Sequence, residues 1–168
     1  MINMADYIKE TNYLYDPDSG IAQVILTDCH GRLYSGIAIC AEQDNDMKAE
    51  YTGYTIAEKR AWISFYKGWL RNEIKPQLRA LRQLYYSMNR SKKFYPGHYE
   101  AFMLKRYIHR LEKQLTDMED DISRMQLDLR DYIDNKDKLY KAIRAKRILE
   151  EDVDFDPYEA PEALDDVD

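Results

Sequence analysis

The sequence predicts an α+β protein with a small N-terminal antiparallel β-meander, a long antiparallel helical hairpin or coiled coil, and a disordered acidic tail. Three observations support this class. Strand-forming residues before position 42 fall into short runs separated by turn residues, apolar residues after position 55 recur at helical spacing, and residues 150–168 contain ten acids and no base. We therefore divide the chain into residues 1–50, 51–149 and 150–168.

The meander is predicted from two turns. The first runs from Asp16 to Gly20 and contains Pro17, which can open a type I turn. The second runs from Asp28 to Gly31, where glycine can adopt the positive φ of a hairpin with a bulge. A sheet of three short strands is not stable alone, so we expect helices to cover one of its faces.

The first helix is predicted to begin near Thr55, a plausible N-cap with Glu58 three residues later, and to end near Met88. Pro76 interrupts this helix. Its ring removes a backbone hydrogen bond and clashes with the carbonyl group four residues earlier, so we expect a bend or break at residues 71–75.

The second helix carries the strongest structural pattern in the chain. Nine apolar residues alternate steps of four and three, as in a coiled-coil seam: Leu104, Ile108, Leu111, Leu115, Met118, Ile122, Met125, Leu129 and Tyr132. This helix should be longer than the first, so part of its seam needs a partner within the chain or in another copy. We expect a homo-oligomer formed through this seam.

Residues 59–93 contain ten bases and the single acid Glu73. A basic stripe beside aromatic residues is typical of a surface that binds a nucleic-acid backbone or a nucleotide. The alternative is charge pairing within the hairpin, in which Lys67 and Arg71 lie level with Asp121 and Asp117. The stripe consists of Lys67, Arg71, Lys75, Arg79 and Arg82.

Two further segments are candidate contact sites. The connector between the helices has no acid near it, and it offers Arg90, Lys92, Lys93, Phe94 and Tyr95 to a phosphate or a protein partner. The acidic tail carries two aromatic residues, Phe155 and Tyr158, which can anchor a docking motif. A solvated turn and a solubilising terminus are the alternatives for these segments.

Several function classes lack support in the sequence. No apolar run is long enough for a membrane span, and the N-terminus lacks the pattern of a signal peptide, so we expect a cytoplasmic protein. The spacing of Cys29, Cys40 and the three histidines fits no metal site. No catalytic constellation or phosphate-binding loop is recognisable. We expect a non-enzymatic protein without metal or cofactor.

Two segments, GIAICAEQD at 36–44 and GYTIAEKRA at 53–61, resemble small accessory proteins of bacteriophages that infect Gram-positive bacteria. Those proteins also join a short β-meander to helices through a similar pattern. The resemblance implies an accessory product, in a group that includes anti-defence proteins, which bind a nuclease or sequester a nucleotide signal. It brings no catalytic residues and does not extend to the coiled-coil seam.

Three hypotheses follow for function. The first is a phage-type interaction protein that inhibits a defence or nucleic-acid-handling protein in the host cytoplasm, contacting it through the tail or the basic connector. The second is direct binding of a nucleic acid or nucleotide through the basic helix at 59–93. The third is a structural coiled-coil component of a phage assembly.

Overall fold

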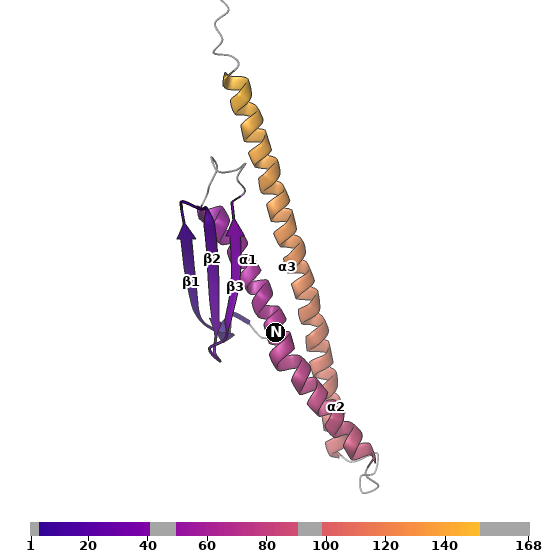
Figure 1. Cartoon of the computed structure of the whole chain (residues 1–168). Coiled ribbons are helices and arrows are strands. Elements are labelled where there is room, and N and C mark those ends of the chain that lie inside the picture. The colour runs from indigo at the N-terminus through magenta and orange to yellow at the C-terminus, as the bar shows by residue number, and fades with distance from the viewer. Residues whose placement is uncertain (1–3, 41–49, 91–98, 152–168) are drawn as a thin grey trace, which may run out of the picture. The chain divides into compact units, whose positions relative to one another are not determined.

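The computed structural model describes residues 4–40, 50–90 and 99–151, with side chains through residue 147 (Figure 1). The chain divides into two compact units, residues 1–132 and 133–168. The first unit contains a three-stranded antiparallel sheet followed by helices, which confirms the predicted α+β class. In the second unit, the described residues 133–151 continue a helix that begins in the first.

The sheet is the predicted meander. A short 3-10 helix, η1 (Met4–Tyr7), leads into β1 (Ile8–Asp16), β2 (Ile21–Asp28) and β3 (Leu33–Ile39), which are adjacent in the order β1-β2-β3. The two turns are those expected from the sequence. Both Gly20 and Gly31 have positive φ, at 66° and 78°, so each turn uses a backbone conformation that most other residues avoid.

One face of the sheet packs on α1 (Glu50–Trp69), as Figure 1 shows. Side chains alternate along a strand, so every second residue of β2 and β3 is buried on this inner face. The contact is close because Gly36 has no side chain. A Cβ atom at Gly36 would lie 2.0 Å from the Ala57 carbonyl oxygen. The inner layer consists of Ala22, Val24, Leu26, Tyr34, Ala38, Ala57, Ala61 and Phe65.

The start of α1 differs from the prediction. The helix already includes Glu50, and the hydroxyl group of Thr55 donates a hydrogen bond to the carbonyl oxygen of Tyr51 at 2.8 Å. Thr55 is therefore an interior residue rather than an N-cap. A threonine can satisfy its hydroxyl group by this backward bond, so its preference for caps does not fix a helix start.

The chain does not break before Pro76, where we expected a bend or break, but its regular α-helical hydrogen bonding is interrupted there. A π-helical turn, η3 (Leu70–Ile74), separates α1 from α2 (Lys75–Arg90). The backbone N–H of Lys75 donates to the carbonyl oxygen of Leu70, five residues earlier. The wider turn keeps the chain helical where the proline ring would clash with a regular α-helix.

The last described element is α3 (Tyr99–Glu151), whose first part belongs to the first unit. Ile108, Leu111, Met118 and Ile122 are buried in the same apolar cluster as the residues of α1, η3 and α2. Two ion pairs link α3 to α2: Arg82 to Glu112 at 2.6 Å and Lys75 to Glu119 at 3.3 Å.

Candidate functional site

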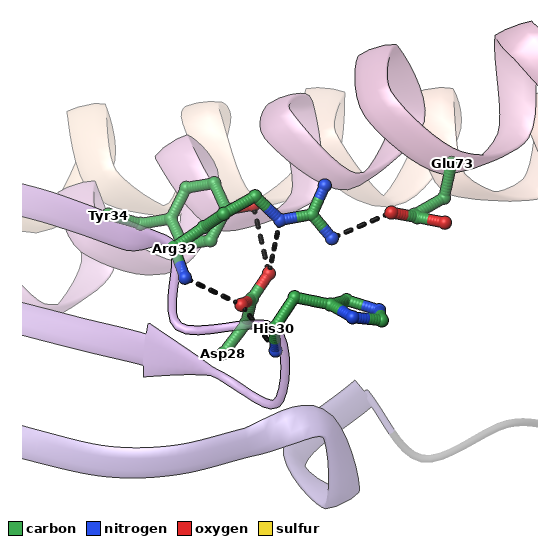
Figure 2. A network of polar contacts seen from close by, with 5 residues as sticks. All are labelled: Asp28, His30, Arg32, Tyr34 and Glu73. Atoms are coloured by element: carbon green, nitrogen blue, oxygen red, sulfur yellow. Dashed lines mark hydrogen bonds and ion pairs between the residues drawn. The ribbon is translucent and has the colours of Figure 1, made fainter.

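The most connected group of polar side chains surrounds Asp28, at the end of β2 (Figure 2). Its carboxylate is fully buried and accepts four hydrogen bonds. Two come from backbone N–H groups, those of His30 and Arg32, each at 2.9 Å. The Arg32 guanidinium donates through Nε at 2.8 Å, and the Tyr34 hydroxyl donates at 3.2 Å. The β2–β3 turn is therefore closed around one buried negative charge.

Arg32 extends this network to the helices. Its second guanidinium nitrogen donates to Glu73 of η3 at 2.7 Å, so one arginine joins the sheet turn to the π-helical turn (Figure 2). Next to this contact, the rings of His30 and Trp69 stack with centroids 6.2 Å apart. These contacts connect the β2–β3 turn to the end of α1 and to η3.

The electrostatics of this group favour a structural role over a catalytic one. Burial alone would raise the pKa of Asp28, but the hydrogen bonds from Arg32 and His30 and the Arg32 charge outweigh it and hold that pKa below its ordinary 3.8. Burial and the nearby Asp28 charge raise the pKa of Tyr34. A carboxylate with four donors and a lowered pKa is a poor proton acceptor near neutral pH, so this group is unsuited to general base catalysis.

The sheet face opposite α1 carries leucine and isoleucine side chains next to polar ones, among them Gln23, Thr27 and Ser35. The pairing register places alternate residues of all three strands on this face, and Leu33 and Ile39 remain 68% and 69% exposed there. No described helix or strand packs on it, and the charged residues of this face lie on β1. We call the following residues the outer sheet face: Leu14, Ile21, Ile25, Leu33, Ile37 and Ile39.

Of the two edge strands of this sheet, β1 and β3, the edge at β3 is partly protected. Arg60 of α1 donates a guanidinium hydrogen bond to the backbone carbonyl oxygen of Ile37 in β3. An exposed edge strand offers unpaired backbone groups to other chains, and a charged side chain placed on it discourages strand addition. Contact with a partner is therefore better accommodated by the outer sheet face than by this edge.

The predicted basic stripe divides into paired and unpaired residues. Lys75 and Arg82 form the ion pairs with Glu119 and Glu112. Arg71 and Lys67 are exposed and form no ion pair within the described ranges, so the expected pairing with Asp117 and Asp121 is absent there. Arg79 and Arg90 are exposed and also lack an ion-pair partner among the described residues.

The π-helical turn also breaks the line of the stripe. In a regular α-helix Lys75 would stack over Arg71, four residues earlier. Here its N–H bonds to Leu70, so the helix after η3 is rotated by roughly one residue, about 100°, relative to α1. Lys67 and Arg71 therefore lie on a different line from Lys75 and the bases that follow it.

The seam residues of α3 lie in the chain's own core rather than on an open surface. Four are buried, and Leu104, Leu115, Met125 and Leu129 are partly buried against the same apolar cluster. Tyr132 is half-buried. An oligomer through this seam remains a prediction. The other predicted contact residues lie outside the described residues: Lys92, Lys93, Phe94, Tyr95, Phe155 and Tyr158.

The sequence reasoning did not identify Asp28, Arg32, Tyr34 and Glu73 as a group, nor the outer sheet face. The sequence predicts only a turn from Asp28 to Gly31, although an aspartate before a glycine turn is a common acceptor for backbone N–H groups. Glu73 offered a weaker signal. It is the single acid among the ten bases of residues 59–93.

Within the described residues, no helix is long and apolar enough to cross a lipid bilayer, and no three metal-ligating side chains gather into a cluster. Neither a protein-family model, nor a curated protein, nor a solved structure matches the chain.

Proposed function

We propose that the protein is a non-enzymatic interaction protein that binds another protein through its outer sheet face. The observation that carries this proposal is a set of exposed leucine and isoleucine side chains, Leu14, Leu33, Ile37 and Ile39, on a sheet whose opposite face already packs on α1. Leucine and isoleucine side chains contribute about 1.5–3 kcal/mol each when they become fully buried. A contiguous exposed group of them typically marks a contact surface.

The chemistry of the face favours a protein over a polyanion. The residues that define it are uncharged, and the nearby charges on β1, Glu10 and Asp16, are both negative. Phosphates need cations, whereas the centre of a protein interface is depleted in charge and rich in apolar side chains. A flat sheet face also suits packing against a second apolar sheet or helix.

The helices are proposed to form an antiparallel hairpin beside the sheet. Both ion pairs support this arrangement, because moving seven residues forward from Lys75 to Arg82 corresponds to moving seven residues back from Glu119 to Glu112. Further toward the sheet, burial and the charge of Asp121 raise the pKa of Tyr66 in α1, as expected if α3 continues alongside α1.

The more specific proposal is that the partner is a host defence or nucleic-acid-handling protein, inhibited in the manner of phage accessory proteins. Its support is the local resemblance at residues 36–44 and 53–61. Part of the first segment is β3 itself, where Ile37 and Ile39 contribute to the outer sheet face. Among the contact residues expected on the tail and the connector, only Arg90 lies within the described residues.

The test compares capture of proteins from a Gram-positive bacterial lysate by wild-type bait and by a Leu33→Lys, Ile39→Lys double variant. The matched control is Leu84→Lys with Leu127→Lys, which charges two leucines that are 50% and 55% exposed on helices. We expect the sheet variant to lose a specific protein that wild type and control retain, at an unchanged melting temperature. Retention of every captured protein by the sheet variant, or capture of none by wild type, contradicts the proposal.

A further inference from the structure

One flank of α2 carries a line of bases and one exposed aromatic ring. Lys75, Arg79, Arg82, Tyr86 and Arg90 follow one another in steps of four, three, four and four, which keeps them on one side of a regular helix. This flank lies beside the buried face of α2, which contains Leu78. No acid occurs anywhere in α2.

The ion pair between Arg82 and Glu112 identifies the flank of α3 that lies beside this line. Counting back from Glu112 in steps of three, four and three reaches His109, Lys105 and Phe102. In an antiparallel helix pair, flanks joined by ion pairs form one continuous surface along both helices. Phe102 and Lys105 therefore extend the basic line of α2 across the neighbouring helix.

The two acids that face the basic line of α2, Glu112 and Glu119, are already paired with it. Glu112 receives Arg82 at 2.6 Å and lies 4.0 Å from the imidazole of His109, and Glu119 receives Lys75 at 3.3 Å. Arg79, Arg90 and Lys105 form no ion pair within the described residues. Three cations thus remain for a ligand.

Two aromatic rings lie among these cations. Tyr86 is 65% exposed and Phe102 is 62% exposed, so neither ring contributes mainly to the core. An exposed aromatic ring does not gain the free energy of burial on folding. Next to arginine and lysine side chains without an ion-pair partner, such a ring can stack on a nucleobase. The distance along α2 from Arg79 to Arg90 is about 16 Å, from eleven residues at about 1.5 Å each, which spans several phosphates of an extended strand.

We infer that this surface, formed by Arg79, Tyr86 and Arg90 of α2 with Phe102 and Lys105 of α3, binds single-stranded nucleic acid. The cations contact phosphates and the two rings stack on bases. A duplex fits less well, because its base faces are already stacked and unavailable to Tyr86 and Phe102. The inference is independent of the outer sheet face and excludes Lys67 and Arg71, which η3 moves to another line.

The first test measures fluorescence anisotropy of a labelled oligo(dT) of about 20 nucleotides, at about 50 and about 200 mM salt. Replacing Arg79, Arg90 and Lys105 by glutamate should weaken binding at least about tenfold and flatten the salt dependence. The matched control, Lys9→Glu with Lys67→Glu and Arg71→Glu, reverses three exposed charges that lie off this surface, on β1, α1 and η3. An equal loss in both variants, or no binding by wild type at the lower salt concentration, overturns the inference.

The second test separates stacking from charge. Tyr86→Ala with Phe102→Ala should weaken oligo(dT) binding roughly tenfold per lost stack while leaving the salt dependence unchanged. Tyr51→Ala with Tyr107→Ala, which truncates rings that are 77% and 48% exposed, serves as the control. The inference also requires wild type to bind oligo(dT) more tightly than a duplex of equal length. Wild-type affinity in the Tyr86/Phe102 variant, or equal affinity for the duplex, overturns it.

Discussion

At the residue scale, the fold depends on one buried charge. Asp28 is fully buried, and its four hydrogen bonds come from the turn that follows it and from Tyr34. A buried carboxylate is stabilising only when its acceptor capacity is filled, because removing one partner leaves the other groups desolvated and unpaired. The network therefore makes the β2–β3 turn a single cooperative element.

We expect Asp28→Asn to lower the free energy of unfolding at pH 7 by about 2–4 kcal/mol, since the amide has one acceptor oxygen where the carboxylate has two. One carboxylate oxygen accepts from the backbone N–H groups of His30 and Arg32, and the other accepts from Arg32 Nε and the Tyr34 hydroxyl, so one of these pairs of donors loses its acceptor. The lowered pKa of Asp28 gives this difference a pH dependence. The contribution of the ionised Asp28 carboxylate to the free energy of unfolding is fully present above the ordinary pKa of the unfolded state. It is lost as pH falls through the lower pKa of the folded state. Urea unfolding from pH 7 down to below pH 3.8 checks this, and the gap between wild type and variant should narrow with acid.

The matched variant for this experiment is Glu73→Gln. Glu73 pairs with the same arginine, but both side chains are about a quarter or more exposed, at 25% and 30%. A pair of this exposure is screened by solvent and contributes at most about 1 kcal/mol. A Glu73→Gln cost equal to that of Asp28→Asn would show that the connection to η3, rather than the buried carboxylate, is the important part.

At the scale of elements, the contact between β3 and α1 depends on a missing side chain. Gly36 lets the strand backbone approach the helix backbone so closely that an added Cβ would lie 2.4 Å from the Ala61 nitrogen. Backbone atoms on both sides of this contact cannot move away without separating the strand from the helix. The distance between the sheet and α1 therefore depends on Gly36 as much as on the large apolar side chains.

We expect Gly36→Ala to destabilise the protein by about 3 kcal/mol or more, at the upper end of overpacking effects. Gly31→Ala is the control, because a Cβ there meets no atom within 4 Å and only the positive φ of 78° is unfavourable. That cost is about 1 kcal/mol. Thermal melts of both variants measure the difference, and equal melting temperatures would show that the β3–α1 contact relaxes easily.

Local rules explain which elements could be predicted from sequence. Gly31 and Pro76 constrain their own backbone, so the second turn and the irregularity before α2 follow from the residues alone. The ion pair of Arg32 with Glu73 joins residues 41 positions apart and depends on how α1 crosses the sheet.

The outer sheet face could not be predicted from sequence for a related reason. Val24, Ile25 and Leu26 are all aliphatic, so alternation in β2 does not reveal which side the helix covers.

At the scale of the whole molecule, two surfaces of different chemistry are separated within the first unit. The outer sheet face is aliphatic and lacks bases, whereas the α2–α3 surface is basic and aromatic. A single binding reaction does not need both kinds of surface. The two proposed contacts therefore use separate surfaces, and the sheet variant and the charge-reversal variant test them independently.

The α3 seam decides whether the molecule needs another copy to bury its apolar residues. Met118 and Ile122 are only 5% and 7% exposed within one chain, in the same cluster as Leu70, Ile74 and Leu78. We therefore expect Ile122→Asp to lower the free energy of unfolding by about 3 kcal/mol or more, because it places a charge in this core without a partner. Leu127→Asp, at a position 55% exposed on the same helix, should have little effect.

Thermal melts and sedimentation together distinguish the two uses of the seam. If the seam serves the chain's own core, Ile122→Asp lowers the melting temperature, and the folded fraction keeps the wild-type mass. A seam shared between copies gives a different result, since charging it should reduce the solution mass while each chain keeps its helical content. A reduced mass at an unchanged melting temperature would therefore contradict the intrachain role. Because Leu115 and Met125 are only partly covered by the same cluster, a second copy could still add contacts along this line without replacing those already made within the chain.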